Sequence, residues 1–177
     1  MAEYTRFDSA NMSWTTTPTL IKNVKFATKA GTVFTNVAVE NGTLVVLDSL
    51  VPGQHDLYYA TVPTVTSTVN DIYIIDNAEV ISDESRQYQI NEFIQKAGVN
   101  SFAGKPLNGD VCFITAKGFA TAPDDATIKT KFIDISTSGK YAISDTATAG
   151  TTLGVIDDII MQGKDKMYVL RFTYVCA

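Results

Sequence analysis

Short runs of apolar and β-branched residues, separated by Gly, Pro, Asn and Asp, follow one another from Leu20 to the end of the chain. This pattern is typical of β-strands that are joined by turns. We expect strands within 21–26, 32–39, 43–47, 57–62, 72–75, 111–115, 128–133, 140–143, 153–160 and 167–175. Long amphipathic helices do not alternate with these runs, so a parallel α/β sheet is disfavoured. The pattern predicts a mainly β fold, an antiparallel barrel or sandwich of short strands.

The dipeptide Asn41-Gly42 lies between the runs 32–39 and 43–47. A type I′ turn needs positive φ at both of its central residues, and Asn-Gly is the dipeptide that supplies this most readily. We therefore predict a β-hairpin of these two runs. Asn41-Gly42-Thr43 is also a glycosylation sequon, but the turn is the preferred interpretation because no export signal precedes it.

One stretch of the chain has the spacing of a helix. Apolar side chains recur at i, i+3, i+4 and i+7 as Ile90, Phe93, Ile94 and Ala97. Ser82 or Asp83 is a suitable N-cap, and Gly98 is a suitable stop. The sequence predicts at most one short helix here, and the alternative is an irregular strap with a helical turn.

The first nineteen residues are polar and irregular, and they contain the single tryptophan, Trp14. Such a segment buries too little apolar surface to order by itself. We expect an extended N-terminal arm (1–19) and one β-rich domain (20–177). The candidate protein interface is Trp14, Thr15, Thr16, Thr17 and Pro18. Trp14 is the expected anchor on a neighbouring protein, because tryptophan is enriched at interface hot spots; the alternative is an intramolecular strap.

Charged residues make up 19% of the chain, below the ~25% of typical soluble domains. An uncharged polar surface is easier to bury against another protein, since desolvating a hydroxyl costs less than desolvating an ion. The net charge of −5 argues against binding to nucleic acid or to an anionic membrane. The chain has neither a signal-peptide pattern nor an apolar run of about 20 residues. We expect a soluble protein made in the cytoplasm.

The residues that carry chemistry are few. The single histidine, His55, lies beside Asp56 in a turn, where an exposed loop residue is the better interpretation than a catalytic base. The acidic pairs Asp83-Glu84, Asp124-Asp125 and Asp157-Asp158 lack a calcium-loop pattern and are read as turn or cap residues. Two carboxylates that face each other across a cleft stay open as a glycosidase alternative. We predict no enzyme, no metal and no cofactor.

Cysteines and aromatic residues are also given structural interpretations. Cys112 and Cys176 lie in apolar stretches and are expected to be reduced and buried, although a disulfide between them stays open. Tyr168, Phe172 and Tyr174 alternate along the last run, which is typical of core or cross-strand positions. A stacking platform for sugars is the functional alternative.

The segments "TVFTNVAVENGTLVVL" (32–47) and "AGKPLNGDVCFIT" (103–115), with a polar arm and a Thr-rich, low-charge composition, carry a family resemblance. The chain resembles the small auxiliary head proteins of tailed bacteriophages, which decorate or cement the capsid. This resemblance implies a non-enzymatic virion protein on the capsid surface that binds the major capsid protein or other virion proteins, as a homo-oligomer or a lattice-bound multimer. The alternatives are a carbohydrate-binding β-sandwich of a head fibre or adhesin, a coat protein and a tail-tube protein.

Overall fold

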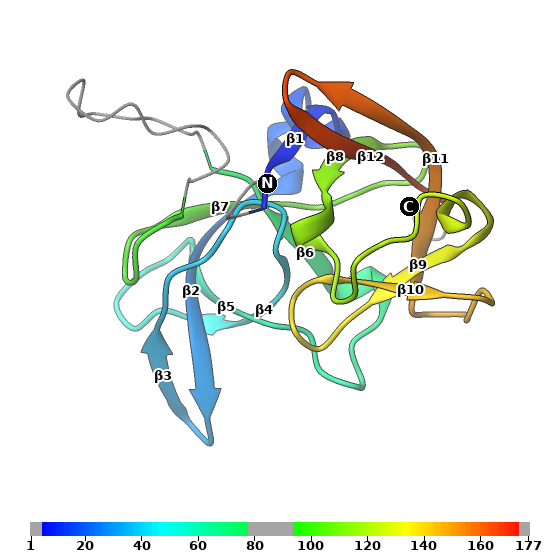
Figure 1. Ribbon diagram of the computed structural model, residues 1–177. Coiled ribbons are helices and arrows are strands. Elements are labelled where there is room, and N and C mark those ends of the chain that lie inside the picture. The colour runs from blue at the N-terminus through cyan, green and yellow to red at the C-terminus, as the bar shows by residue number, and fades with distance from the viewer. Residues whose placement is uncertain (1–4, 78–93, 174–177) are drawn as a thin grey trace.

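The computed structural model describes residues 5–77 and 94–173, which form two β-sheets with short connections (Figure 1). Twelve strands occur in this part of the chain: β1 (Phe7–Asn11), β2 (Ile21–Ala30), β3 (Val33–Asn36), β4 (Leu44–Leu50), β5 (Leu57–Thr61), β6 (Ile72–Ile75), β7 (Ser101–Gly104), β8 (Val111–Thr115), β9 (Phe132–Ile135), β10 (Tyr141–Ser144), β11 (Thr152–Gln162) and β12 (Asp165–Phe172). The prediction of a mainly β fold is confirmed.

The first sheet is antiparallel throughout, in the order β1-β8-β12-β11-β9-β10. Its longest pairing joins β11 to β12 and contains a bulge between Ile156 and Asp158. A bulge adds one residue to one strand and bends it. Asp157 and Asp158, which were interpreted from the sequence as turn or cap residues, therefore lie at a bulge within one continuous strand.

The second sheet, in the order β3-β2-β5-β4-β6-β7, closes on itself because β2 also pairs with β7. Five strands, β2, β5, β4, β6 and β7, thus form a small barrel. All of these pairings are antiparallel except β2 with β5, which is parallel. Strand β3 pairs only with the far end of β2, so the β2–β3 hairpin extends from the barrel (Figure 1).

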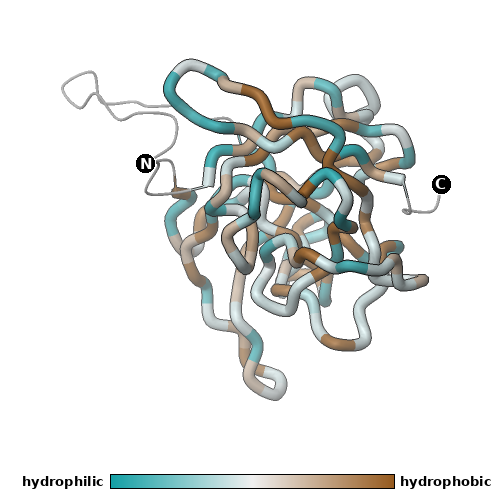
Figure 2. Tube along the Cα trace, turned by 45° about the vertical axis from the view of Figure 1, so that its right-hand side comes forward, coloured by the Kyte–Doolittle hydropathy of each residue, from teal (hydrophilic) through white to brown (hydrophobic). Residues whose placement is uncertain are grey.

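Alternation along the barrel strands divides the core into two clusters. Leu44 and Ile74 face the first sheet, whereas their neighbours Val45 and Ile75 face the barrel interior. Successive side chains of a strand point to opposite faces, so one strand serves both clusters. Many of the hydrophobic segments in Figure 2 run through the middle of the molecule, where these clusters lie. The fold is a barrel with a sheet packed on one side.

The predicted Asn41-Gly42 hairpin is wrong. Strand β3 pairs with β2, and β4 pairs with β5 and β6. Gly42 has a φ of 82°, but no non-glycine residue of the described chain has a positive φ, so Asn41 does not form a type I′ turn. Its side chain is buried and instead bridges to the backbone of Asn77, from which it accepts one hydrogen bond and to which it donates another, both at 3.0 Å.

The N-terminal segment, expected as an arm, packs on the chain itself. Phe7 and Met12 are buried, and β1 is the edge strand beside β8. Trp14 is only 3% exposed, and its indole Nε1 donates a hydrogen bond to Asp76 at 2.8 Å. This burial contradicts the hypothesis that Trp14 is held ready for a neighbour, and it agrees with the intramolecular strap. The boundary between an arm and a domain at residues 19 and 20 is not visible in the structure.

The remaining strand predictions agree closely with the structure. Strands β5, β6 and β8 lie within the predicted ranges, β10 extends one residue past its range to Ser144, and β9 begins only at Phe132. Residues 128–130 form a 3₁₀ turn rather than the start of a strand. The described helices are short 3₁₀ turns: Ser13–Thr15, Pro18–Leu20, Val69–Asp71, Ala116–Gly118 and Ile128–Thr130. No helix among the described residues has the length and apolarity to cross a bilayer.

The predicted helix lies mostly outside the described residues, which resume at Ile94. Gln95 pairs with Val39 in a two-residue bridge, with hydrogen bonds of 3.0 and 2.8 Å. Gly98 follows in a turn with a φ of 78°. The described end of the stretch is therefore a bridge and a turn.

Candidate interaction surface

The described acidic pairs take part in ion pairs and turns. Arg171 donates to Asp157 from Nε at 2.6 Å and from Nη2 at 2.9 Å, and these bonds lower the pKa of that carboxyl. Lys129 pairs with Asp158 at 2.6 Å. Asp83-Glu84 lies outside the described residues. The ion pairs of Asp157 and Asp158 stabilise the first sheet, and these two carboxylates do not face each other across a cleft.

Asp124 and Asp125 serve the turn that follows β8 and the strand β12. Thr127 Oγ1 donates to Asp124 at 3.0 Å, and Ala126 N–H donates at 3.2 Å. Tyr168 OH donates to Asp125 at 2.7 Å, and Lys166 pairs with the same carboxylate. The interpretation of this pair as turn residues holds for Asp124, whereas Asp125 links two distant segments.

The other candidate groups show no catalytic arrangement. His55 is exposed in a turn, and Asp56 accepts a hydrogen bond from Asn23 at 3.1 Å. Cys112 is fully buried, and burial raises the pKa of its thiol; Cys176 lies outside the described residues. Among residues 5–77 and 94–173, no group of three His, Cys, Asp or Glu side chains has the spacing to hold a metal ion.

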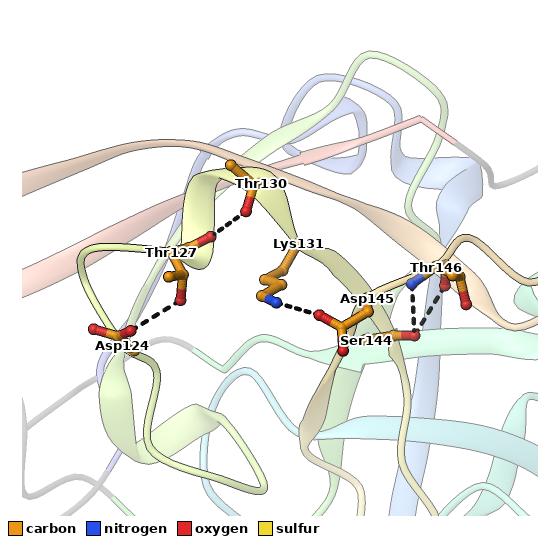
Figure 3. A network of polar contacts seen from close by, with 7 residues as sticks. All are labelled: Asp124, Thr127, Thr130, Lys131, Ser144, Asp145 and Thr146. Carbon is orange, nitrogen blue, oxygen red and sulfur yellow. Dashed lines mark hydrogen bonds and ion pairs between the residues drawn. The ribbon is translucent and has the colours of Figure 1, made fainter.

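A hollow of about 290 Å³ lies beside the turn before β9 and beside β10. Figure 3 shows polar side chains in this hollow and beside it, several of which contact one another. Thr130 Oγ1 donates to Thr127 O at 2.8 Å, and Lys131 pairs with Asp145. Because these groups already have partners within the chain, a ligand would have to break their contacts. The arrangement holds the turn against the β9–β10 hairpin.

A second hollow, of about 220 Å³, lies between the barrel and the turn 138–140. Leu44 N–H donates to Gly139 O at 2.7 Å on one side of it. Its rim includes Thr5 and Ile94, each the first described residue after a part of the chain that the structure leaves undescribed. We assign no ligand to this hollow.

The outer edge of β3 is the candidate interaction surface. Val37 N–H donates to Phe26 O at 3.2 Å, and backbone groups alternate in direction along an antiparallel strand. The backbone N–H and C=O groups of Thr35 therefore point to β2, whereas the backbone groups of Phe34 and Asn36 point away from it. No described strand pairs with this outer side. Unpaired backbone groups at a sheet edge are a template for another strand.

Side-chain contacts hold the β2–β3 hairpin at a fixed position on the barrel. The rings of Phe34 and Tyr59 stack with their centroids 4.1 Å apart and their planes 3° apart. Lys29 Nζ lies 5.1 Å from the centre of the Phe34 ring and 2.6 Å from Asp48 Oδ2. The hydrogen bond from Lys29 lowers the pKa of Asp48. The edge is therefore preorganised, although its outer side has no described partner.

The two edges of the first sheet carry protective features. Strand β1 contains Asp8 and an irregular register between Asp8 and Asn11. In β10, the carbonyl of Tyr141 accepts a hydrogen bond from Ala120 N–H at 2.8 Å, and the strand is flanked by Lys140 and Asp145. Charges, bulges and covering loops are the means by which proteins block edge pairing.

Strand β3 carries neither a charge nor a bulge in its pairing with β2. No charged residue and no proline occurs in 32–39, and Val33 is 63% exposed. The sequence predicted a strand here but not that its outer edge is exposed. The reason is that the incorrectly predicted Asn41-Gly42 hairpin placed the run 43–47 beside this strand. The absence of charge over eight residues was the available signal.

The predicted interface residues divide into two groups. Trp14 is buried in the core, as described above. Thr15, Thr16, Thr17 and Pro18 are exposed around a short 3₁₀ turn, and their role at an interface stays a prediction. Likewise, Tyr168 and Phe172 are buried and cannot form a sugar platform, whereas Tyr174 lies outside the described residues.

No family model, no curated protein and no solved structure matches this chain.

Proposed function

We propose that this protein is a non-enzymatic structural protein of a virion, a decoration protein that binds the outer capsid lattice through protein–protein contacts. The observation that supports binding is the uncharged, projecting edge of β3. The phage-head assignment rests on the sequence resemblance of 32–47 and 103–115. On this proposal the protein contacts the major capsid protein, forms a multimer on the lattice, and is located on the capsid surface after synthesis in the host cytoplasm.

Strand addition suits this task physically. An extended segment that adds to a sheet edge gains main-chain hydrogen bonds, and its alternate side chains give specificity. A four-residue edge contributes a small area, so one contact is weak. Many copies on one particle compensate, because linked binding events gain from a high effective concentration. The exposed threonines of 15–17 supply further surface with a low desolvation cost.

Cosedimentation tests the proposal. Purified protein is mixed with empty heads assembled from the major capsid protein of the same genome, and the heads are pelleted. We expect saturable binding at a fixed ratio of protein to capsid subunit. Protein that stays in the supernatant at saturating heads would refute the decoration role, and it would leave a coat or tail-tube subunit as the structural alternative.

A matched pair of variants connects binding to the β3 edge. Val33→Lys places a charge on that edge, and Val65→Lys makes the same change at a valine that is 88% exposed elsewhere. A lysine on an edge strand discourages pairing. We expect Val33→Lys to reduce head binding and Val65→Lys to leave it unchanged. Equal binding by both variants would exclude the edge as the contact.

A carbohydrate-binding module is the second candidate, because the Phe34–Tyr59 stack is flanked by the Lys29–Asp48 pair. Aromatic faces beside polar groups suit sugars, whose rings have both apolar and polar faces. A glycan array would test this candidate. Binding that is lost in Tyr59→Ala and retained in Val33→Lys would favour it over the decoration role.

A further inference from the structure

We propose that the free edge of β3 pairs antiparallel with the β3 edge of a second copy of this chain, with the two-fold axis beside Thr35. The pairing rests on the proposed function in one respect, since it supplies the contact between neighbouring copies of the lattice multimer. Val33→Lys then reduces head binding because it removes that contact. Two properties of the edge favour a second copy as the occupant, its backbone register and its lack of charge, and its size determines how strong the pair can be.

The register is self-complementary. With Thr35 on the axis, Phe34 of each copy lies opposite Asn36 of the other. These are the two residues whose N–H and C=O groups point away from β2, as the bond from Val37 to Phe26 indicates. Each opposed pair exchanges two main-chain hydrogen bonds in an antiparallel ladder. In a two-fold interface the same patch serves both partners, and β3 meets this requirement with its own residues.

The side chains and charges allow this pairing. Thr35 lies opposite its counterpart, and Thr–Thr cross-strand pairs are favourable. Lys29, whose ammonium group lies over the Phe34 ring, is paired with Asp48 at 2.6 Å. It lies one strand further in, so the two lysines are about three strand spacings apart, ~14 Å. That separation exceeds the ~8 Å screening length at physiological salt, so like-charge repulsion is small.

The size of the edge predicts a weak pair. Stable interfaces bury at least ~1,200 Å² in total, and two four-residue strands bury less. We therefore expect fast, reversible association at high concentration rather than a permanent dimer. On a particle, where copies are held close together, the same contact links neighbours through effective concentration.

Cysteine cross-linking of the full-length protein tests the register, in a Cys176→Ser background that leaves the buried Cys112. Thr35→Cys places the two cysteines on the axis, where opposed Cα atoms of a non-hydrogen-bonded pair lie ~4.5 Å apart, within the range for a disulfide. Thr28→Cys is the matched control, because Thr28 is an exposed threonine opposite Thr35 on β2. Its counterpart lies about 14 Å away, too far to bridge.

We expect disulfide-linked dimer to form about tenfold faster in Thr35→Cys than in Thr28→Cys under mild oxidation. Sedimentation velocity of the parent should show concentration-dependent association that Val33→Lys removes and Val65→Lys retains. Equal cross-linking of the two cysteine variants, or a parent that sediments as a monomer at every concentration, would overturn the self-pairing. Head binding is measured separately, so a parent protein that binds heads but does not self-associate would reject this inference alone.

Discussion

Trp14 and Asp76 join the start of the chain to the end of strand β6. The indole Nε1 of Trp14 donates to a carboxylate oxygen of Asp76 at 2.8 Å, across 62 residues of sequence. The indole ring lies flat against Gly104, the last residue of β7. Neighbouring Ser13 donates from its backbone and its hydroxyl to the buried carboxylate of Asp110. The N-terminal segment therefore connects both sheets and is part of the folded unit.

Replacing Trp14 tests the strap. Trp14→Ala removes a large buried side chain and should lower the free energy of unfolding by ~3–5 kcal/mol. Trp14→Phe keeps an aromatic ring but leaves Asp76 without its indole donor, which should cost ~1–3 kcal/mol. The exposed Thr19→Ala should change stability by less than ~0.5 kcal/mol. Urea unfolding measures all three, and a Trp14→Ala protein as stable as the parent would restore the mobile-arm hypothesis.

The close contact between the Trp14 ring and Gly104 can also be tested by changing the glycine. A Cβ on Gly104 would lie 2.2 Å from Trp14 Cδ2, well inside contact distance. Gly104→Ala should therefore displace the indole and destabilise the fold by ~1–3 kcal/mol, as overpacking does. Gly163→Ala is the control, since that position has open space but a φ of 65°. Its cost should be ~1 kcal/mol, and a Gly104→Ala melting temperature above that of Gly163→Ala would contradict the packing.

The sequence predicted local strands better than it predicted their partners. Strands β6 and β8 are continuous apolar runs bounded by turn residues, so local composition was sufficient. Strand β1, "FDSAN", has one large apolar residue, and it becomes a strand because β8 offers it an edge. Sheet order depends on long-range packing, which a local pattern does not contain. For this reason the sequence showed the lack of charge in 32–39 but not that this strand forms the edge of a sheet.

Acid should weaken the Asp157–Arg171 pair. The guanidinium of Arg171 lowers the pKa of Asp157 in the folded state below its usual 3.8. The pair therefore stabilises the protein above that usual pKa, and the contribution is lost as the pH falls through the lower folded value. Both side chains are more than a third exposed, so the effect is small and screened by salt.

Thermal melts from pH 6 to pH 2.5 check the Asp157 prediction. The melting temperature of the parent should fall further over this range than that of Asp157→Asn, because the variant has no carboxylate to protonate at this position. Arg171→Gln should behave like Asp157→Asn, because it removes the cause of the pKa shift. Parallel curves for all three proteins would show that the pair does not contribute.

Asn41→Gly separates the two interpretations of the Asn-Gly dipeptide. In a type I′ turn glycine is as suitable as asparagine, so the substitution would be nearly neutral. In the structure Asn41 is buried and exchanges two hydrogen bonds with the backbone of Asn77. Its loss leaves a buried N–H and C=O without their partner, at ~1–3 kcal/mol for each group. We expect a clear drop in the free energy of unfolding.

The second Asn-Gly of the chain supplies the control for Asn41. Asn108 precedes Gly109 in an exposed turn, where Gly109 has a φ of 93°. Asn108→Gly removes an exposed side chain and should cost less than ~1 kcal/mol. Urea unfolding of the two variants gives the comparison directly. If Asn41→Gly were as mild as Asn108→Gly, the bridge to Asn77 would not hold β4 and β6 together, and the turn interpretation would return.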